Sequence, residues 1–119
     1  MAKKVLVAED EKMMLKAISF KLQKEGYEVH AAEDGKQALE LLRTGEFDLL
    51  VSDIMMPFAS GLELVTEIKT NELKTKTLLL SALGQESTVL KAFSLGADDY
   101  MTKPFSPNEL IVRIKKLIG

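Results

Sequence analysis

Strand-like runs and helical patterns alternate along this chain of 119 residues, and the alternation limits the fold more than any other feature. Runs typical of strands lie at residues 4–8, 28–32, 48–52, 77–81 and 99–102. Each run is followed by a helical pattern, which is the order that builds a parallel sheet with helices on its faces. The central runs are continuously apolar, as strands buried on both faces are, whereas the more polar run at 28–32 suits a sheet edge.

Capping signals mark the ends of the expected helices. The first helical pattern covers residues 11–25 and the fourth covers 86–95, and a glycine follows each as a stop signal. The other three begin with a polar residue followed three positions later by Glu or Gln, the pattern of a capping box. These pairs are Asp34 with Gln37, Ser60 with Glu63, and Ser106 with Glu109. Five βα units result, and right-handed crossovers favour a doubly wound three-layer sandwich of the flavodoxin-like type with strand order 2-1-3-4-5.

Composition narrows the functions that are open to the chain. With 46% hydrophobic residues, 119 residues suffice for one domain, which we expect to cover residues 1–119. The formal net charge of -2 provides no basic surface, so we expect no direct contact with nucleic acid. The chain has no cysteine, which excludes disulfides and thiolate metal sites, and no apolar run approaches the ~20 residues that span a bilayer. We therefore expect a soluble, cytoplasmic domain that does not enter a membrane.

Polar residues stand at the ends of four of the expected strands. Ligand sites of open α/β sheets lie beyond the carboxyl ends of the strands, so the end residues should converge. They are Glu9 and Asp10, Asp53, Ser81 and Lys103. Three neighbouring carboxylates repel one another, so either one of them stays protonated or a cation enters. Oxygen ligands without a nearby Cys or His favour Mg²⁺ as that cation.

The remaining groups extend this prediction from metal binding to phosphoryl transfer. Carboxylates with Mg²⁺, the Lys103 ammonium and the Ser81 hydroxyl form a set that neutralises charge on a phosphoryl group. Asp53 ends the expected central strand and is the best placed nucleophile, since a carboxylate can form an acyl phosphate. The backbone carbonyl of Met55, two residues further on, could turn back to bind the ion. His30 lies in the expected edge strand and is interpreted as a packing or solvated residue.

Four segments together resemble the receiver domain of two-component response regulators, over essentially the whole chain. They are residues 5–10 (VLVAED), residues 53–57 (DIMMP) with Gly61, the pair Ser81-Ala82, and residues 96–105 (GADDYMTKPF). Their order and spacing follow the family pattern, most closely that of receivers of winged-helix transcriptional regulators. The resemblance implies a phosphorylation-dependent signalling switch of a two-component phosphorelay, and not an enzyme that turns over an external substrate.

The resemblance also implies roles for the acidic residues. Asp53 would accept a phosphoryl group from a histidine kinase, a phosphotransfer protein or a small acyl phosphate, with only self-phosphorylation and autodephosphorylation as activity. Asp10, Asp53 and the Met55 carbonyl would bind Mg²⁺, and Glu9 would act through water. Glu9 stands where the family has either Asp or Glu, so it is a tolerated variation.

Further roles fall on residues near the ends of the last two strands. Lys103 would pair with the phosphoryl group and Ser81 would donate a hydrogen bond to it. Tyr100 would be the aromatic switch, exposed before phosphorylation and drawn inward as Ser81 moves, because the added charge and acceptor oxygens draw the loops together. The Lys103-Pro104 bond resembles the cis peptide of the family.

A possible dimer surface is also implied by the resemblance. Receivers of winged-helix regulators dimerise through the face of the fourth helix, fifth strand and fifth helix. The corresponding charged residues here are Lys91, Asp98, Asp99, Glu109 and Arg113. Without the resemblance, Asp98 and Asp99 would be interpreted as plain surface charge.

Three other functions remain open on the residues alone. A Mg²⁺-dependent phosphohydrolase could use the same Asp53 nucleophile, but Ile54 and Met55 follow it where a second carboxylate would serve, and no insertion is long enough for a cap. A flavin or nucleotide carrier would need a first loop that attracts phosphate, whereas residues 9–11 are all acidic. A degenerate receiver that never takes phosphate would not need the complete set of site residues.

Overall fold

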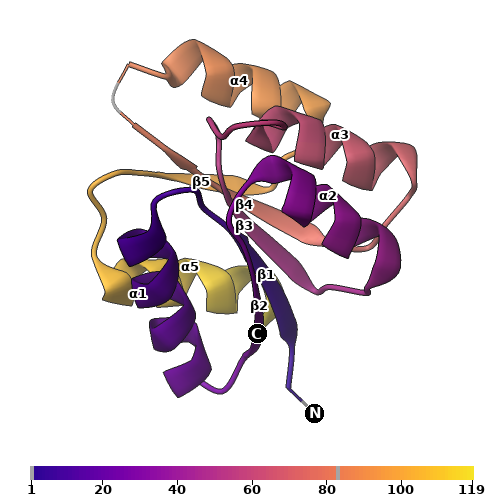
Figure 1. Ribbon diagram of the computed structural model, residues 1–119. Helices are drawn as coiled ribbons and strands as arrows, with labels where there is room; N and C mark the ends of the chain where they lie inside the picture. The colour runs from indigo at the N-terminus through magenta and orange to yellow at the C-terminus, as the bar shows by residue number, and fades with distance from the viewer. Residues whose placement is uncertain (1, 83) are drawn as a thin grey trace.

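Parallel strands and helices alternate through the computed structural model, which describes residues 2–82 and 84–119. The strands within these residues are β1 (Lys4–Ala8), β2 (Glu28–Ala32), β3 (Leu49–Asp53), β4 (Lys76–Ser81) and β5 (Asp99–Thr102). The helices within them are α1 (Lys12–Lys24), α2 (Gly35–Thr44), α3 (Gly61–Thr70), α4 (Glu86–Leu95) and α5 (Pro107–Ile118). The strands form one 5-stranded parallel sheet in the order β2-β1-β3-β4-β5 (Figure 1). The predicted doubly wound fold and strand order are confirmed.

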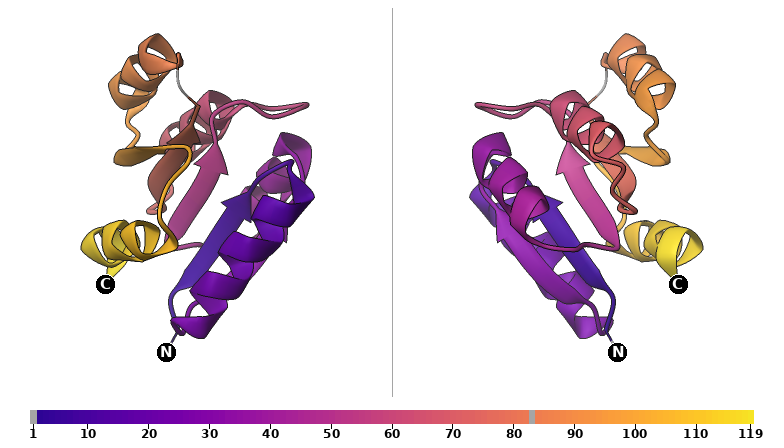
Figure 2. Two further views of the ribbon diagram at one scale, coloured as in Figure 1. Left: turned by 90° about the vertical axis from the view of Figure 1, so that its left-hand side faces the viewer. Right: turned by 90° about the vertical axis from the view of Figure 1, so that its right-hand side faces the viewer.

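The helices divide between the two faces of the sheet. Figures 1 and 2 show α1 and α5 on one face and α2, α3 and α4 on the other. Leu15 and Ile18 of α1 pack with Leu110 and Ile114 of α5 in one core cluster, which also holds the inward side chains of β1, β3 and β4. Two smaller clusters lie under the other three helices. β1, β3 and β4 are therefore buried on both faces, as their apolar runs predicted.

The helix starts confirm the predicted caps only in part. The side chains of Asp34, Ser60 and Ser106 each accept a hydrogen bond from a backbone amide in the first turn of their helices. Among the described residues, none of the three pairs forms the return bond of a capping box. Gln37 Oε1 instead accepts from Glu33 N at 2.9 Å, one residue before the cap. The first helix has a cap that the sequence did not reveal, because the Glu11 carboxylate accepts from Met13 N and Met14 N.

Two polar residues outside the predicted site have structural roles. His30 lies edge-to-face against Phe47, with ring centroids 5.4 Å apart, which confirms its interpretation as a packing residue. Asp98 is exposed, as its interpretation as surface charge expected, but it also has a structural role. Its carboxylate accepts hydrogen bonds from Thr77 N at 2.8 Å and Thr77 Oγ1 at 3.3 Å. Asp98 therefore ties the turn before β5 to the start of β4.

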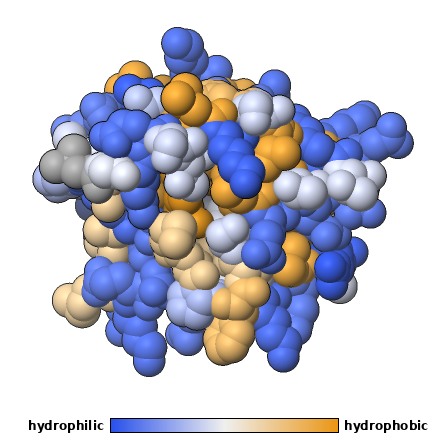
Figure 3. Space-filling model, turned by 90° about the horizontal axis from the view of Figure 1, so that it is seen from above, coloured by the Kyte–Doolittle hydropathy of each residue, from blue (hydrophilic) through white to orange (hydrophobic). Residues whose placement is uncertain are grey.

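The surface of the described residues is mixed in character. Viewed from above, hydrophobic side chains gather toward the middle of the molecule and hydrophilic ones surround them (Figure 3). None of the helices within residues 2–82 and 84–119 has both the length and the apolar composition that crossing a bilayer requires.

Candidate functional site: an acidic pocket at the strand ends

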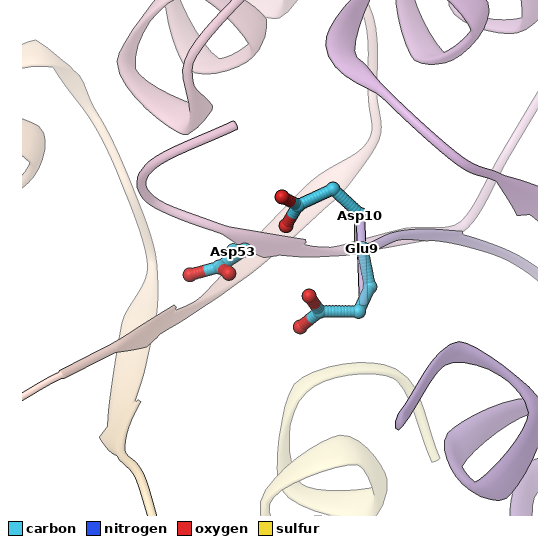
Figure 4. A group of neighbouring side chains, drawn as sticks. All are labelled: Glu9, Asp10 and Asp53. Carbon is cyan, nitrogen blue, oxygen red and sulfur yellow. The ribbon is translucent and has the colours of Figure 1, made fainter. Parts of the chain in front are cut away.

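Three carboxylates meet where β1 and β3 end. Glu9 and Asp10 follow β1 directly, and Asp53 is the last residue of β3. The two strands are neighbours, with Ala8 opposite Ser52, so the next residue of each strand lies at the same height. One oxygen from each of the three carboxylates lies within 4.8 Å of the others, and the side chains of Glu9 and Asp10 point toward Asp53 (Figure 4). The predicted convergence of these residues is observed.

Lys103 lies between two of these carboxylates. Its ammonium donates hydrogen bonds to Glu9 Oε1 and to Asp53 Oδ2, both at 2.9 Å. Its backbone is fixed as well, because Lys103 N donates to Ser81 O at 2.7 Å and extends the pairing of β5 with β4. The Lys103-Pro104 peptide bond that follows is cis, as expected. The sequence predicted that Lys103 lies near the acidic residues but not which of them it contacts.

Burial and charge shift the acid–base behaviour of this pair. The Glu9 residue is only 1% exposed, and burial raises the pKa of its carboxyl group above the usual range. The backbone N–H of Glu11 and the Lys103 ammonium reduce this rise, and the charge of Asp53 adds to it. For Lys103, burial by itself lowers the pKa, but hydrogen bonds and charge from Asp53 and Glu9 outweigh burial and raise it. Lys103 is therefore a stable cation inside the acidic pocket.

The donor set of the pocket fits a hard divalent cation. All its donors are carboxylate oxygens, and Asp10 is exposed, so an ion there could keep part of its water shell as Mg²⁺ usually does. Lys103 neutralises only part of the charge of three carboxylates, which leaves a net negative pocket. The pocket is compatible with Mg²⁺ and with phosphorylation of an aspartate.

The loop after Asp53 is held by two close backbone contacts. Gly61 N donates to Ile54 O at 2.8 Å, and a Cβ on Gly61 would lie 2.8 Å from Asp53 O, so only glycine fits there. At the other side, Gly35 packs against Ala59 so closely that a Cβ would clash with the Ala59 carbonyl. Gly35 N also donates to Pro57 O at 3.2 Å, which fastens the loop to the start of α2. Figure 2 shows this loop projecting from the sheet edge.

Ser81 is the last residue of β4, the neighbour of β3, and Tyr100 lies in β5. Both line a cavity of about 310 Å³ between α4 and the ends of β4 and β5. Ser81 is 2% exposed and Tyr100 is 38% exposed. The Tyr100 ring lies edge-to-face against Phe93 of α4, with centroids 5.7 Å apart. Phe93 is a contact of the predicted switch residue that the sequence analysis did not identify, because helical periodicity gives no sign of an aromatic partner on β5.

One charged residue of the last strand pairs with one of the last helix. Arg113 of α5 donates to both carboxylate oxygens of Asp99 at 3.1 Å and to Tyr100 O at 3.3 Å. Asp99 is thus not plain surface charge either, since it fixes α5 against the strand that carries Tyr100. Met55, whose backbone carbonyl is predicted to bind the ion, is 57% exposed.

Comparisons with known proteins agree with this geometry. Residues 5–115 match the family model described as the response regulator receiver domain. The chain is 39% identical over 118 residues to the alkaline phosphatase synthesis transcriptional regulatory protein PhoP of Bacillus subtilis (strain 168), which covers 99% of this chain and 49% of that protein. The chain thus spans about half the length of this curated relative.

Solved structures show the same likeness. The receiver domain of the Francisella response regulator 1452 is 39% identical, with a TM-score of 0.90 over 98% of this chain and 96% of that one. DrrB of Thermotoga maritima, described as an OmpR/PhoB homolog, is 38% identical, with a TM-score of 0.86 over 98% of this chain and 52% of that one. The chain belongs to the receiver domain family of response regulators, which act as phosphorylation-dependent signalling switches in two-component systems.

Proposed function

We propose that Asp53 is the phosphoacceptor of this receiver domain. The observation that carries the proposal is the position of its carboxylate, 2.9 Å from the Lys103 ammonium and within 4.8 Å of carboxylate oxygens of Glu9 and Asp10. With 13% of its side chain exposed, Asp53 is accessible to a donor and still shielded from bulk water. A carboxylate in this setting has a cation ready beside the position that an incoming phosphoryl group would take.

The reaction is an in-line transfer to a carboxylate oxygen of Asp53. The new P–O bond forms as the P–N bond of a phosphohistidine, or the P–O bond of a small acyl phosphate, breaks. The electron pair of the broken bond leaves with the imidazole, which takes a proton from solvent, or with the released carboxylate. In autodephosphorylation a water oxygen attacks the phosphorus, inorganic phosphate leaves, and the Asp53 carboxylate is restored. These self-directed steps are the only chemistry we assign to the chain.

The proposed Mg²⁺ ligands are Asp10, Asp53 and the Met55 carbonyl, with Glu9 acting through water. The ion supplies charge neutralisation between the carboxylates and the phosphoryl oxygens. Lys103 would shift from pairing with the Asp53 carboxylate to pairing with the phosphoryl group bound to it. Glu9 would keep a bond to Lys103 and so hold the ammonium in place during this shift.

We further propose that Ser81 and Tyr100 transmit the phosphorylation to the surface. The Ser81 hydroxyl would move to bond a phosphoryl oxygen, and Tyr100 would then turn inward. The cavity of about 310 Å³ that both residues line supports this proposal, because it offers room for the ring beneath its exposed position. The edge-to-face contact with Phe93 would be exchanged in that movement, which shifts an existing two-state equilibrium.

Partners follow from the same proposal. A histidine kinase or phosphotransfer protein would supply the phosphoryl group, and the hydrophobic middle of the surface in Figure 3 suits a protein partner. A homodimer through α4, β5 and α5 would use Lys91, Asp98, Asp99, Glu109 and Arg113. We propose no contact of residues 1–119, taken as one domain, with nucleic acid or membrane. A cytoplasmic location fits a chain without cysteine.

Intact mass after incubation with Mg²⁺ and acetyl phosphate tests the assignment. The chain should gain one phosphoryl group, and Asp53→Asn should abolish the gain. Asp34→Asn is the matched control, because Asp34 is a helix cap outside the pocket and its loss should leave labelling unchanged. Labelling that persists in Asp53→Asn would place the nucleophile elsewhere.

A further inference from the structure

Gln85 makes an unexpected contact at the start of α4. It occupies the cap position of this helix, yet its side chain makes no capping bond to α4 within the described residues. Its Oε1 instead accepts a hydrogen bond from Ala82 N at 2.7 Å. The Gln85 side chain thus folds back onto the residue that follows β4, away from the helix that it precedes.

The Ala82 amide points toward the phosphoacceptor strand. Ile54 N donates to Leu80 O at 2.9 Å, so the backbone polar groups of Leu80 face β3. Lys103 N donates to Ser81 O, so those of Ser81 face β5. Because these directions alternate along a strand, the N–H of Ala82 faces the β3 side again.

β3 ends at Asp53, before the position that would pair with Ala82. Continued parallel pairing would give the Ala82 amide Ile54 O as its acceptor. That carbonyl already accepts from Gly61 N at 2.8 Å, because the chain turns away after Asp53. The Ala82 amide is therefore directed at the end of β3, and the only acceptor that the described residues provide for it is Gln85 Oε1.

We propose that the Gln85 carboxamide is a latch that occupies the Ala82 amide until a phosphoryl group on Asp53 displaces it. This inference rests on the proposed function. A phosphoryl oxygen is charged, and charge-assisted hydrogen bonds are roughly twice as strong as neutral ones, so it wins the competition for this amide. The displaced carboxamide is then free to cap the amides at the start of α4. The exchange couples the phosphorylation of Asp53 to the position of α4.

Two variants with opposite expectations test the latch in the full chain. Gln85→Met keeps the length of the side chain and removes the acceptor, so beryllofluoride with Mg²⁺ should bind about 2- to 10-fold more tightly, the gain expected from freeing one amide. Gln85→Glu keeps an acceptor and adds negative charge beside the phosphoryl position, so the same ligand should bind more weakly than in wild type. A merely structural role in loop folding would shift both variants in the same direction.

Amide hydrogen exchange of Ala82 gives a readout that needs no ligand. Exchange at this amide should be at least about 2-fold faster in Gln85→Met than in wild type, while Glu86→Gln serves as a neighbouring control and should change it less. Unchanged exchange in Gln85→Met, or weaker beryllofluoride binding by that variant, would overturn the latch. Failure of the wild-type chain to bind beryllofluoride or to be labelled at Asp53 would instead overturn the proposed function.

Discussion

The Lys103 ammonium and the Asp53 carboxylate form a 2.9 Å hydrogen bond although the two residues are 50 positions apart in the chain. The same ammonium binds Glu9, so one lysine compensates two carboxylates in a partly buried pocket. Three neighbouring carboxylates repel one another, and either a retained proton or a cation relieves that repulsion. Without a metal ion, the cation is Lys103.

Loss of Lys103 should destabilise the metal-free chain and make its stability depend on Mg²⁺. Lys103→Gln leaves the buried Glu9 without its charged partner, so the free energy of unfolding should fall by about 1–3 kcal/mol. Added Mg²⁺ should recover part of this loss, because it restores positive charge to the pocket. Urea unfolding with and without Mg²⁺ measures both effects. Lys116→Gln, a change at an exposed lysine, should show neither, and a fully stable Lys103→Gln would contradict the pairing.

Removal of Mg²⁺ should lower the melting temperature of the wild-type chain. A ligand that binds only the folded state stabilises it by about 2.7 kcal/mol at a concentration 100 times its Kd. Thermal melts over a Mg²⁺ series, with EDTA as the zero point, should therefore show a saturating rise. Asp10→Asn should flatten this rise, whereas Glu63→Gln, a change at an exposed carboxylate on α3, should keep it. An equal rise in Asp10→Asn would remove Asp10 from the ion site.

The stability of the chain should decline above pH 10 through Tyr27. This residue is 8% exposed, its hydroxyl donates to Gly119 O at 3.1 Å, and burial raises the pKa of its phenol. A folded-state pKa above the unfolded value of about 10 means that the contribution is complete below pH 10 and is lost as the pH rises through the folded value. The advantage of wild type over Tyr27→Phe in urea unfolding should therefore shrink from pH 9 to pH 11. A constant difference would contradict the raised pKa.

A strained turn after Asp53 should be relieved by glycine. Phe58 has φ 72° and an 80% exposed side chain, and Ala59 N donates to Pro57 O at 2.9 Å across it, which makes a three-residue turn of the positive-φ kind. Phe58→Gly should raise the free energy of unfolding by about 0.5–1.5 kcal/mol. Phe58→Ala removes the ring and keeps the Cβ, so it should bring no comparable gain. Equal effects of the two changes would trace the effect to the ring.

The fold was predictable because its signals are local and repeated. The runs of β1, β3 and β4 are continuously apolar, whereas a strand with one buried face would alternate, so they indicated central strands. The bounds of β1, β2 and α4 match the residues expected. β3 begins and ends one residue later than predicted, although the Asp48 backbone still bonds Lys4 O at 2.8 Å and Lys76 N at 3.0 Å. The Asp48 carboxylate also accepts from Lys4 N at 2.8 Å. A bond from a side chain to a distant backbone leaves no mark in periodicity.

The pocket was predictable from topology, but its contacts were not. Parallel strands end at one edge of the sheet, and this predicted that Glu9, Asp10 and Asp53 lie close together. The bonds of Asp98 to Thr77 and of Gln85 to Ala82 depend on the path of each loop in space, and many short polar side chains would have fitted the same positions. The residues of the pocket could therefore be predicted from the sequence, whereas the side chains that hold the neighbouring segments in place could not.

The close contact of Ala59 with Gly35 makes the α2 side of the strand ends stiffer than the α4 side. On the α2 side, backbone meets backbone, and the loop cannot shift without dragging the helix start along. On the α4 side, the segment that follows β4 is held at Ala82 by the side chain of Gln85. A change at the end of β3 should therefore move the α4 side more than the α2 side. We expect the surface that differs between the two states of this chain to lie on the α4 side.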